Sequence, residues 1–250
     1  MRSLIYVPVV HTEMDMGSLA EGLQALYCAR YGAAKWEEHI RTIREMWRGI
    51  GERINALQIG FRRMKLYQDG LPVCGKEELI VRELALQGSL NHQLLGQLMD
   101  RGAKLVGTES PELLLREYYL VKSQLARGAI EGAPQAGRIG APTSRRTPGS
   151  AAQIARTTLR ERDRFIARRI EETLAEDETG ILFMGFAHNV HRCLSGSIKV
   201  QFLIHRLPFG KDLSLRAKRN GLCGDEVGQA SSLSGRQLAG PTKGVQHGFG

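Results

Sequence analysis

The sequence predicts an α/β fold in which a mostly parallel sheet of about five strands is flanked by helices. The first observation is that short apolar runs alternate with longer segments of helical periodicity, which is typical of right-handed βαβ units. The second is the run 181–187, which is apolar at six of seven positions and stops at His188. Such a run is typical of a strand buried on both faces. Residues 1–209 are therefore expected to form a single domain.

A long helical insertion is expected after the first strand, which covers residues 4–10. Pro8 cannot donate a hydrogen bond to a β ladder, so it favours an edge position for this strand. The first helix of the insertion is expected to run from an N-cap at Ser18 to Tyr31, with Glu21 at the capping-box position.

The segment 36–57 has apolar residues at alternating steps of four and three, which predicts a long helix with a heptad-like stripe. The residues of the stripe are Trp36, Ile40, Ile43, Trp47, Ile50, Ile54 and Leu57. Two interpretations are open: the stripe packs on the sheet or on a neighbouring helix, or it forms the interface of a homodimer.

The middle of the chain continues the alternation of strands and helices. Short strands are expected at 64–69 and 103–109, where apolar runs end at turn or helix-start residues. Between them, the pattern predicts helices over 77–86 and 91–100, each followed by a glycine. A Ser-Pro pair then begins a helix over 110–126, with serine as the N-cap and proline at the first helical position.

The last third of the chain contains two segments of low apolar content. Residues 128–150 are rich in Gly, Ala, Pro and Ser and predict a flexible loop or a lid. A helix is then expected over 151–175, followed by the strand that ends at His188 and by an outer strand over 198–205. Residues 210–250 are predicted to be a disordered tail.

One charge lies on the apolar stripe of the helix 151–175. Arg162 comes three residues after Leu159 and four before Ile166, so it shares their face of the helix. Arginine is rarely buried without a partner. Two interpretations are open: the side chain reaches the edge of the helix, or it forms a salt bridge with a buried acid near a functional site.

The composition, with 42% hydrophobic and 24% charged residues, is ordinary for a soluble globular protein. The net charge is +9, but 128–150 and 211–250 hold nine Lys/Arg against four Asp/Glu, or +5 of it. A solvated basic surface is therefore favoured over a nucleic-acid site. The four scattered cysteines indicate neither a disulfide framework nor a zinc ribbon. Because no run resembles a signal peptide or a membrane helix, a cytoplasmic protein is expected.

Four of the predicted strands end in an ionisable residue, namely His11, Asp69, Glu109 and His188. The carboxyl ends of parallel strands meet at one edge of a sheet, where α/β proteins bind their ligands, so these side chains are expected to lie together. Two imidazoles and one or two carboxylates can divide general acid–base work or bind a divalent metal. His191 follows His188 by three residues, a spacing that suits a pair of metal ligands.

The motifs Gly185-Phe-Ala-His188, Thr108-Glu109 and Arg162-Asp163, with a histidine that ends the first strand, resemble the erythromycin esterase/ChaN/TraB–Tiki superfamily. The resemblance covers residues 1–209 and implies an EreA/ChaN-like α/β domain. It implies that His188 is the histidine of the second Gly-x-x-His motif, with Glu109 and Arg162 as its acid and base partners. The pair His188 and His191 also resembles the paired histidines of the esterase branch. One departure is that His11 ends a Pro-Val-Val-His sequence without the glycine of the first motif.

The first functional hypothesis is a hydrolase that uses water to attack an ester or amide bond. His11 or His188 would activate the water, alone or through a divalent metal such as Zn, Mn or Co. Glu109 is expected to orient a histidine or bind the metal, and Arg162 to pair with Glu109 or stabilise the oxyanion.

The remaining site predictions concern ligands. The predicted metal ligands are His11, Glu109, His188 and His191. Asp69 and Glu13 are predicted to contact the substrate, a small molecule or a peptide. The alternative hypothesis is a non-enzymatic protein that binds haem or a metal through the same histidines.

Overall fold

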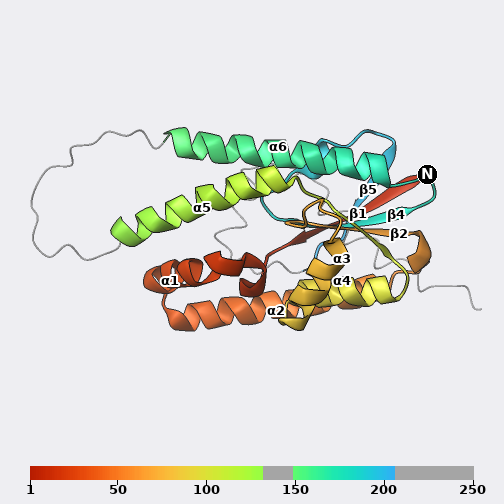
Figure 1. Ribbon diagram of the computed structural model, residues 1–250. Coiled ribbons are helices and arrows are strands. Elements are labelled where there is room, and N and C mark those ends of the chain that lie inside the picture. The colour runs from red at the N-terminus through yellow and green to blue at the C-terminus, as the bar shows by residue number, and fades with distance from the viewer. Residues whose placement is uncertain (132–148, 206–250) are drawn as a thin grey trace, which may run out of the picture. The chain divides into compact units, whose positions relative to one another are not determined.

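The computed structural model describes residues 1–131 and 149–205 and confirms the predicted α/β fold (Figure 1). Its sheet is parallel throughout, in the strand order β3-β2-β4-β1-β5. The strands are β1 (Arg2–Val9), β2 (Met64–Gln68), β3 (Lys104–Val106), β4 (Thr179–Gly185) and β5 (Ile198–Phe202). The prediction of a disordered tail over 210–250 and most of the predicted loop or lid lie outside the described residues.

Helices lie on both sides of the sheet (Figure 1). The α-helices of the described residues are α1 (Ala20–Tyr31), α2 (Ala33–Asn55), α3 (Glu77–Leu86), α4 (Leu90–Asp100), α5 (Pro111–Glu131) and α6 (Gly149–Thr173). Short 3-10 helices are η1 (Glu13–Leu19), η2 (Phe61–Arg63) and η3 (Val190–Arg192). Figure 1 shows α5 and α6 on one side and α2 and α4 on the other. The predicted helical insertion after the first strand corresponds to η1, α1 and α2.

The first strand is not the edge strand that Pro8 predicted, because β1 pairs with β4 on one side and β5 on the other. The reason is the register of β5. Its pairing with β1 ends at Tyr6, and Leu203 donates its backbone N–H to the Tyr6 carbonyl at 2.9 Å. Backbone groups alternate along a strand, so the nitrogen of Pro8 faces the β5 side, two residues beyond the paired register. A ladder donor is therefore not needed at Pro8.

Helix boundaries differ from the prediction at two places. Helix α1 begins at Ala20 after Leu19, and Ser18 lies within η1 instead of capping α1. The capping box lies six residues earlier than the predicted pair of Ser18 and Glu21, and is formed by Thr12 with Asp15 at the start of η1. Helix α5 is longer than expected, since it reaches residue 131, and α6 is shifted by two residues, since it begins at 149 and ends at 173.

The apolar stripe of α2 packs against one face of the sheet. Ile43, Trp47 and Ile50 are buried in a hydrophobic cluster that includes Val7 of β1 and Phe183 of β4. This confirms the interpretation that the stripe packs within the chain. A homodimer through the helix predicted at 36–57 stays a prediction.

The opposite face of the sheet is covered by α6. Ile166 and Ile170 pack there against Tyr6 of β1 and Leu182 of β4. Strand β4 therefore contributes to both clusters, which confirms that it is buried on both faces.

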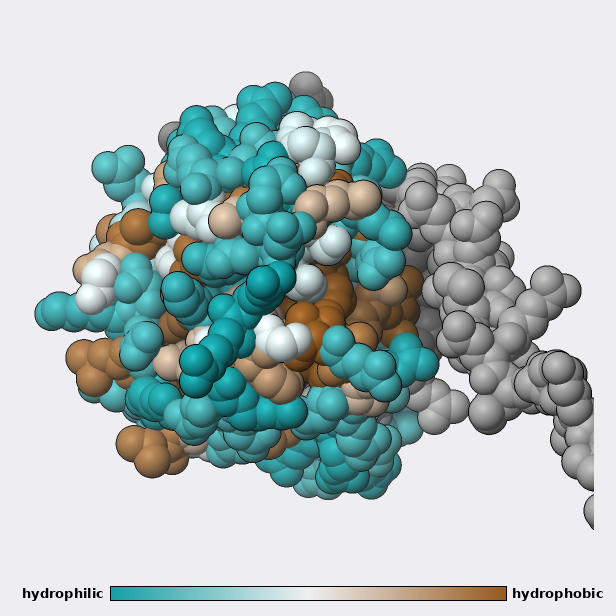
Figure 2. Space-filling model, turned by 90° about the vertical axis from the view of Figure 1, so that its right-hand side faces the viewer, coloured by the Kyte–Doolittle hydropathy of each residue, from teal (hydrophilic) through white to brown (hydrophobic). Residues whose placement is uncertain are grey.

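Within residues 1–131 and 149–205, none of the helices combines the length and the apolar character that crossing a membrane requires. Figure 2 views the side at which the strands begin, and hydrophilic side chains cover most of it. The candidate site lies at the other ends of the strands.

Candidate functional site

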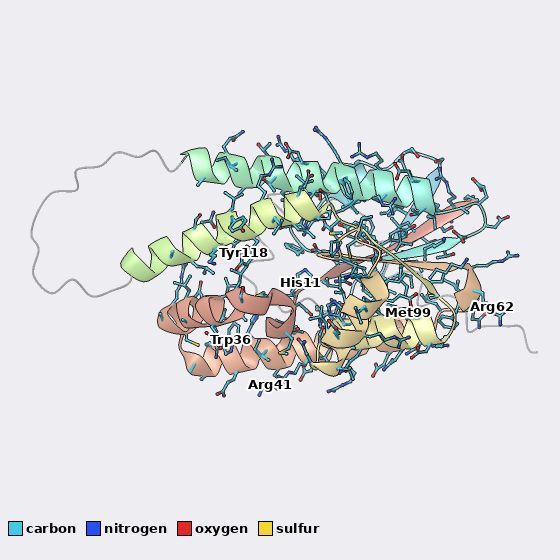
Figure 3. The ribbon with its side chains drawn as sticks, in the orientation of Figure 1. His11, Trp36, Arg41, Arg62, Met99 and Tyr118 are labelled. Atoms are coloured by element: carbon cyan, nitrogen blue, oxygen red, sulfur yellow. The ribbon has the colours of Figure 1, made fainter. Side chains whose placement is uncertain are left out.

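The carboxyl ends of three neighbouring strands bring the predicted residues together. Strands β2, β4 and β1 are adjacent in the sheet, and Asp69, His188 and His11 follow them in the chain. Figure 3 shows His11 at this edge, between α5 and the η1–α1 segment. The expectation that these strand ends share one edge is therefore confirmed, and we call the connected residues around Asp69 the edge network: His11, Asp69, Glu109, Arg162, Asp163 and His188.

Asp69 lies at the centre of the edge network. Its Oδ2 atom accepts a hydrogen bond from the Gly185 backbone N–H at 2.8 Å and lies 3.0 Å from His11 Nε2. The same oxygen is 3.7 Å from His188 Nε2. Its Oδ1 atom accepts a hydrogen bond from Arg162 at 2.6 Å. Asp69 was predicted to contact the substrate. In the structure its carboxylate connects both histidines to Arg162.

Arg162 of α6 forms a salt bridge with buried acids, which confirms the second of the two interpretations left open for it. Its guanidinium is buried and donates to both oxygens of Glu109, with 3.1 Å between Nε and Oε2. It also donates to Asp69 and Glu117. Because Nε and both terminal nitrogens already donate to carboxylates, the geometry favours the pairing role of Arg162 over a role as oxyanion donor.

His188 has a carboxylate partner of its own in the neighbouring residue of Arg162. The Nδ1 atom of His188 is 2.6 Å from Asp163 Oδ1, and the Asn189 backbone N–H donates to Asp163 Oδ2 at 3.1 Å. A carboxylate can only accept, so the partner assigns the proton to Nδ1. The Nε2 atom of His188 is then the nitrogen that faces Asp69.

Gly185 allows the edge network to close. A Cβ atom at this position would lie 2.6 Å from Asp69 Oδ2 and 3.4 Å from His11 Nε2. The first distance is shorter than real Cβ contacts, so a side chain here would displace the Asp69 carboxylate. The glycine three residues before His188 is therefore required for the close approach of backbone and carboxylate.

The charges of the edge network shift the pKa values of its members. Burial alone would raise the pKa of Asp69, but the hydrogen bond and charge of His11 hold it well below 3.8. Burial lowers the pKa of His11, and the hydrogen bond to Asp69 reverses this, so the net pKa is above 6.5. The pKa of His188 is likewise raised above 6.5 by Asp163 against the effect of burial. Burial raises the pKa of Glu109 in spite of Arg162.

Access to the edge network is uneven. The His11 side chain is 27% exposed, against 7% for Asp69 and 4% for His188. Glu109 and Arg162 are buried. A ligand that approaches this edge therefore meets the His11 imidazole before the other members of the network.

The other two predicted site residues are His191 and Glu13. The structure places the ring of His191 in an aromatic group, with its centroid 5.7 Å from that of Tyr6 and 5.2 Å from that of Phe202. Glu13 is the first residue of η1, and its side chain lies outside the described part of the structure. Neither observation supplies a direct contact with Asp69.

The predicted metal set can be tested against these contacts. Glu109 offers both oxygens to Arg162, and Asp69 receives a guanidinium, an amide and an imidazole. Among the described residues, His, Cys, Asp and Glu do not form a group of three that could hold a metal ion. In this arrangement the oxygens of Glu109 and Asp69 are engaged by protein groups, and metal or haem binding stays a prediction.

Sequence reasoning did not select Asp163 and Glu117 as site residues. Asp163 is adjacent to Arg162 and close to the apolar stripe of α6. This second charge near the stripe is the sequence feature that could have identified Asp163 as a site residue. Glu117 follows the N-cap Ser110 by seven residues, two turns along α5, which places it on the same side as the helix start. Its pairing with Arg162 depends on how α5 and α6 pack, which the local pattern does not contain.

Comparison with family models, with curated proteins and with solved structures gives no match to this chain. The resemblance to the erythromycin esterase/ChaN/TraB–Tiki superfamily therefore stays a prediction. The case for a function depends on the geometry of the edge network.

Proposed function

We propose that this protein is a hydrolase that uses histidine to activate water for attack on an ester or amide carbonyl. One observation carries the proposal: His11 and His188 are each paired with a buried carboxylate at the ligand-binding edge of a parallel sheet. A carboxylate partner fixes the tautomer of a catalytic imidazole and stabilises the imidazolium that forms during proton transfer.

His11 is the general base in this proposal because it is the more accessible of the two imidazoles of the edge network. Ionised Asp69 accepts the proton carried by His11 Nε2, which leaves the other ring nitrogen of the neutral imidazole to take a proton from water. His188 is assigned the acid role, because Asp163 at its Nδ1 and Asp69 on its Nε2 side stabilise the imidazolium and raise the pKa of His188.

Glu109 and Arg162 support the two histidines in the proposal. Arg162 holds Asp69 and Glu109 together in a buried salt bridge, so it fixes the position of the carboxylate that pairs with His11. A buried arginine with several carboxylate partners has little freedom to move toward a substrate. Its assigned role is therefore to position Asp69, and the proposal includes no step on a metal.

The test is hydrolysis of p-nitrophenyl acetate and of simple peptides by the purified chain and its variants. His11→Gln and His188→Gln are each expected to lower kcat by about 10²- to 10⁴-fold, the usual contribution of a general acid or base. His39→Gln is the matched control, because His39 stacks on Tyr27 between α1 and α2. Equal rates in the wild type and both site variants, with folded protein, would contradict the proposal.

Metal analysis of the same preparation tests the metal-assisted form of the prediction. A stoichiometric metal whose removal abolishes hydrolysis would assign water activation to the metal instead of to His11. A Soret band on addition of haem, lost in His188→Gln, would favour the alternative of a haem-binding protein.

A further inference from the structure

A second buried polar group lies beside the edge network, where η1 meets the start of α4. We call it the Asp15 cluster, formed by Thr12, Asp15, Ser89 and His92. Ser89 donates its hydroxyl to Asp15 Oδ1 at 2.5 Å, and His92 Nδ1 lies 2.7 Å from Ser89 Oγ and 3.3 Å from Asp15 Oδ1. The side chains of Asp15 and His92 are 4% and 8% exposed.

Serine, histidine and aspartate invite comparison with a nucleophilic triad, but the geometry excludes that role. In such a triad the serine and the carboxylate bind opposite ring nitrogens, whereas Ser89 and Asp15 both lie at Nδ1 of His92. Ser89 is also fully buried and caps α4. The hydroxyl proton of Ser89 is donated to Asp15. In the contact between Ser89 and His92, the donor must therefore be Nδ1–H of His92.

The remaining oxygen of Asp15 binds the residue that follows His11. Asp15 Oδ2 accepts hydrogen bonds from the Thr12 backbone N–H at 2.8 Å and from the Thr12 hydroxyl at 2.9 Å. On the other side of His11, Trp47 donates its indole N–H to the Val10 carbonyl at 3.0 Å. His11 lies beyond the last residue of β1, so these contacts fix the backbone where the ladder has ended.

From this geometry we propose that Asp15 is a positioning residue that holds the His11 imidazole against Asp69. Its carboxylate joins Thr12 to the N-terminus of α4 through Ser89, so a helix of the core sets the path of the exposed histidine. The catalytic meaning of this role depends on the proposed function of His11. A carboxylate serves it better than an amide, since charged acceptors form stronger and more directional hydrogen bonds with these donors.

The direct readout is the imidazole N–H proton of His11, observed by NMR at one fixed pH and assigned by its loss in His11→Gln. In the wild type the bond to Asp69 is expected to protect this proton from exchange with water. In Asp15→Asn, exchange is expected to be about tenfold faster or more. A tenfold change corresponds to a loss of about 1.4 kcal/mol in the stability of the state in which His11 is hydrogen-bonded to Asp69. Glu21→Gln, which removes an exposed acid from α1, is the matched control.

A gentler pair of variants covers the case in which Asp15→Asn does not fold. Thr12→Val removes one hydroxyl donor to Asp15 and is expected to accelerate exchange, whereas Thr12→Ser keeps the hydroxyl and is expected to restore protection. In an active enzyme, Thr12→Val should lower kcat with little change in KM.

The outcomes separate this inference from the proposed function. Unchanged exchange of the His11 proton in folded Asp15→Asn and Thr12→Val would overturn the positioning role, whatever the activity. A wild-type chain without the protected proton would overturn it as well. Faster exchange in the variants of a chain that hydrolyses nothing would support the positioning role and count against the hydrolase.

Discussion

Helices α2 and α6 cover opposite faces of the same sheet, and their buried stripes differ in chemistry. The stripe of α2 is apolar and includes Ile43, Trp47 and Ile50. The buried side of α6 is apolar at Ile166 and Ile170. One turn closer to the N-terminus of the helix, it buries the charged residues Arg162 and Asp163. Both helices seal a core, and only α6 brings charge to the edge of the sheet.

The buried charges of α6 are not explained by stability alone. A buried ion pair is often no more stabilising than well-packed apolar residues of similar volume, so stability does not require charges on α6. The charges of α6 instead hold His188 and Asp69, the carboxylate that pairs with His11. We infer that α2 mainly supports the fold and that α6 also supports the site.

The largest expected effect is on α6. Arg162→Ala leaves the carboxylates of Asp69 and Glu109 buried without their cation, and is expected to lower the free energy of unfolding by about 3–5 kcal/mol. Urea denaturation measures the change. Adding Glu109→Gln should recover part of the loss, because one unpaired charge is removed; a double variant less stable than Arg162→Ala would contradict the buried pairing.

A smaller effect is expected where β4 ends. Gly185→Ala places a methyl group 2.6 Å from Asp69 Oδ2 and is expected to cost about 1–3 kcal/mol, the usual range for overpacking. Hydrolysis should fall with it, because the carboxylate moves away from His11. Gly196→Ala is the control, since a Cβ atom at Gly196 has no neighbour within 4 Å. Equal stability of the two variants would show that the edge network tolerates a side chain at Gly185.

A still smaller effect is expected on α2. Ile50→Val removes one buried methylene from the apolar cluster and is expected to cost about 0.5–1.5 kcal/mol, with unchanged kcat. Ile43→Asp, in contrast, would bury a charge in the same cluster, so a loss of folding would not by itself report a dimer. Light scattering of the wild type and Ile50→Val measures the oligomeric state without that complication.

The pH dependence of stability tests the pairing of Asp69 with the histidines. The pKa values of His11 and His188 are raised above 6.5, so their contribution is complete below pH 6.5 and is lost as pH rises through the folded-state values. The pKa of Asp69 is lowered, so its contribution is present above pH 3.8 and is lost as pH falls through the folded-state value. In Asp69→Asn, denaturation curves should depend less on pH at both ends; an unchanged profile would contradict the pairing.

The sequence predicts the fold and the centre of the site because both are recorded in local patterns. Apolar runs that end at His11 and His188 predict strands, and Arg162 on an apolar stripe predicts a buried partner. Pro8 led to the wrong prediction that β1 is an edge strand. An inner strand tolerates Pro8 because the pairing with β5 ends at Tyr6, and the local sequence of β1 does not contain that information. Asp163 was not selected as a site residue because its link to His188 depends on the packing of α6 against the turn after β4.

The Asp15 cluster shows the same limit more strongly. Asp15 and Ser89 are 74 residues apart, and each has a sufficient local explanation as a capping residue. Their contact exists because α4 packs beside the segment that follows β1. Local helix signals therefore predict the capping roles of Asp15 and Ser89, and do not predict the hydrogen bond between them.

The most direct test of the difference between α2 and α6 compares Asp163→Asn with Ile50→Val in one hydrolysis assay. Each variant changes one buried side chain, and urea denaturation shows whether both remain folded at the assay temperature. We expect Asp163→Asn to lower kcat by about 10²- to 10⁴-fold, because His188 loses the partner that fixes its proton, while Ile50→Val keeps the wild-type rate. Equal rates in the two variants would contradict the claim that α6 supports the reaction.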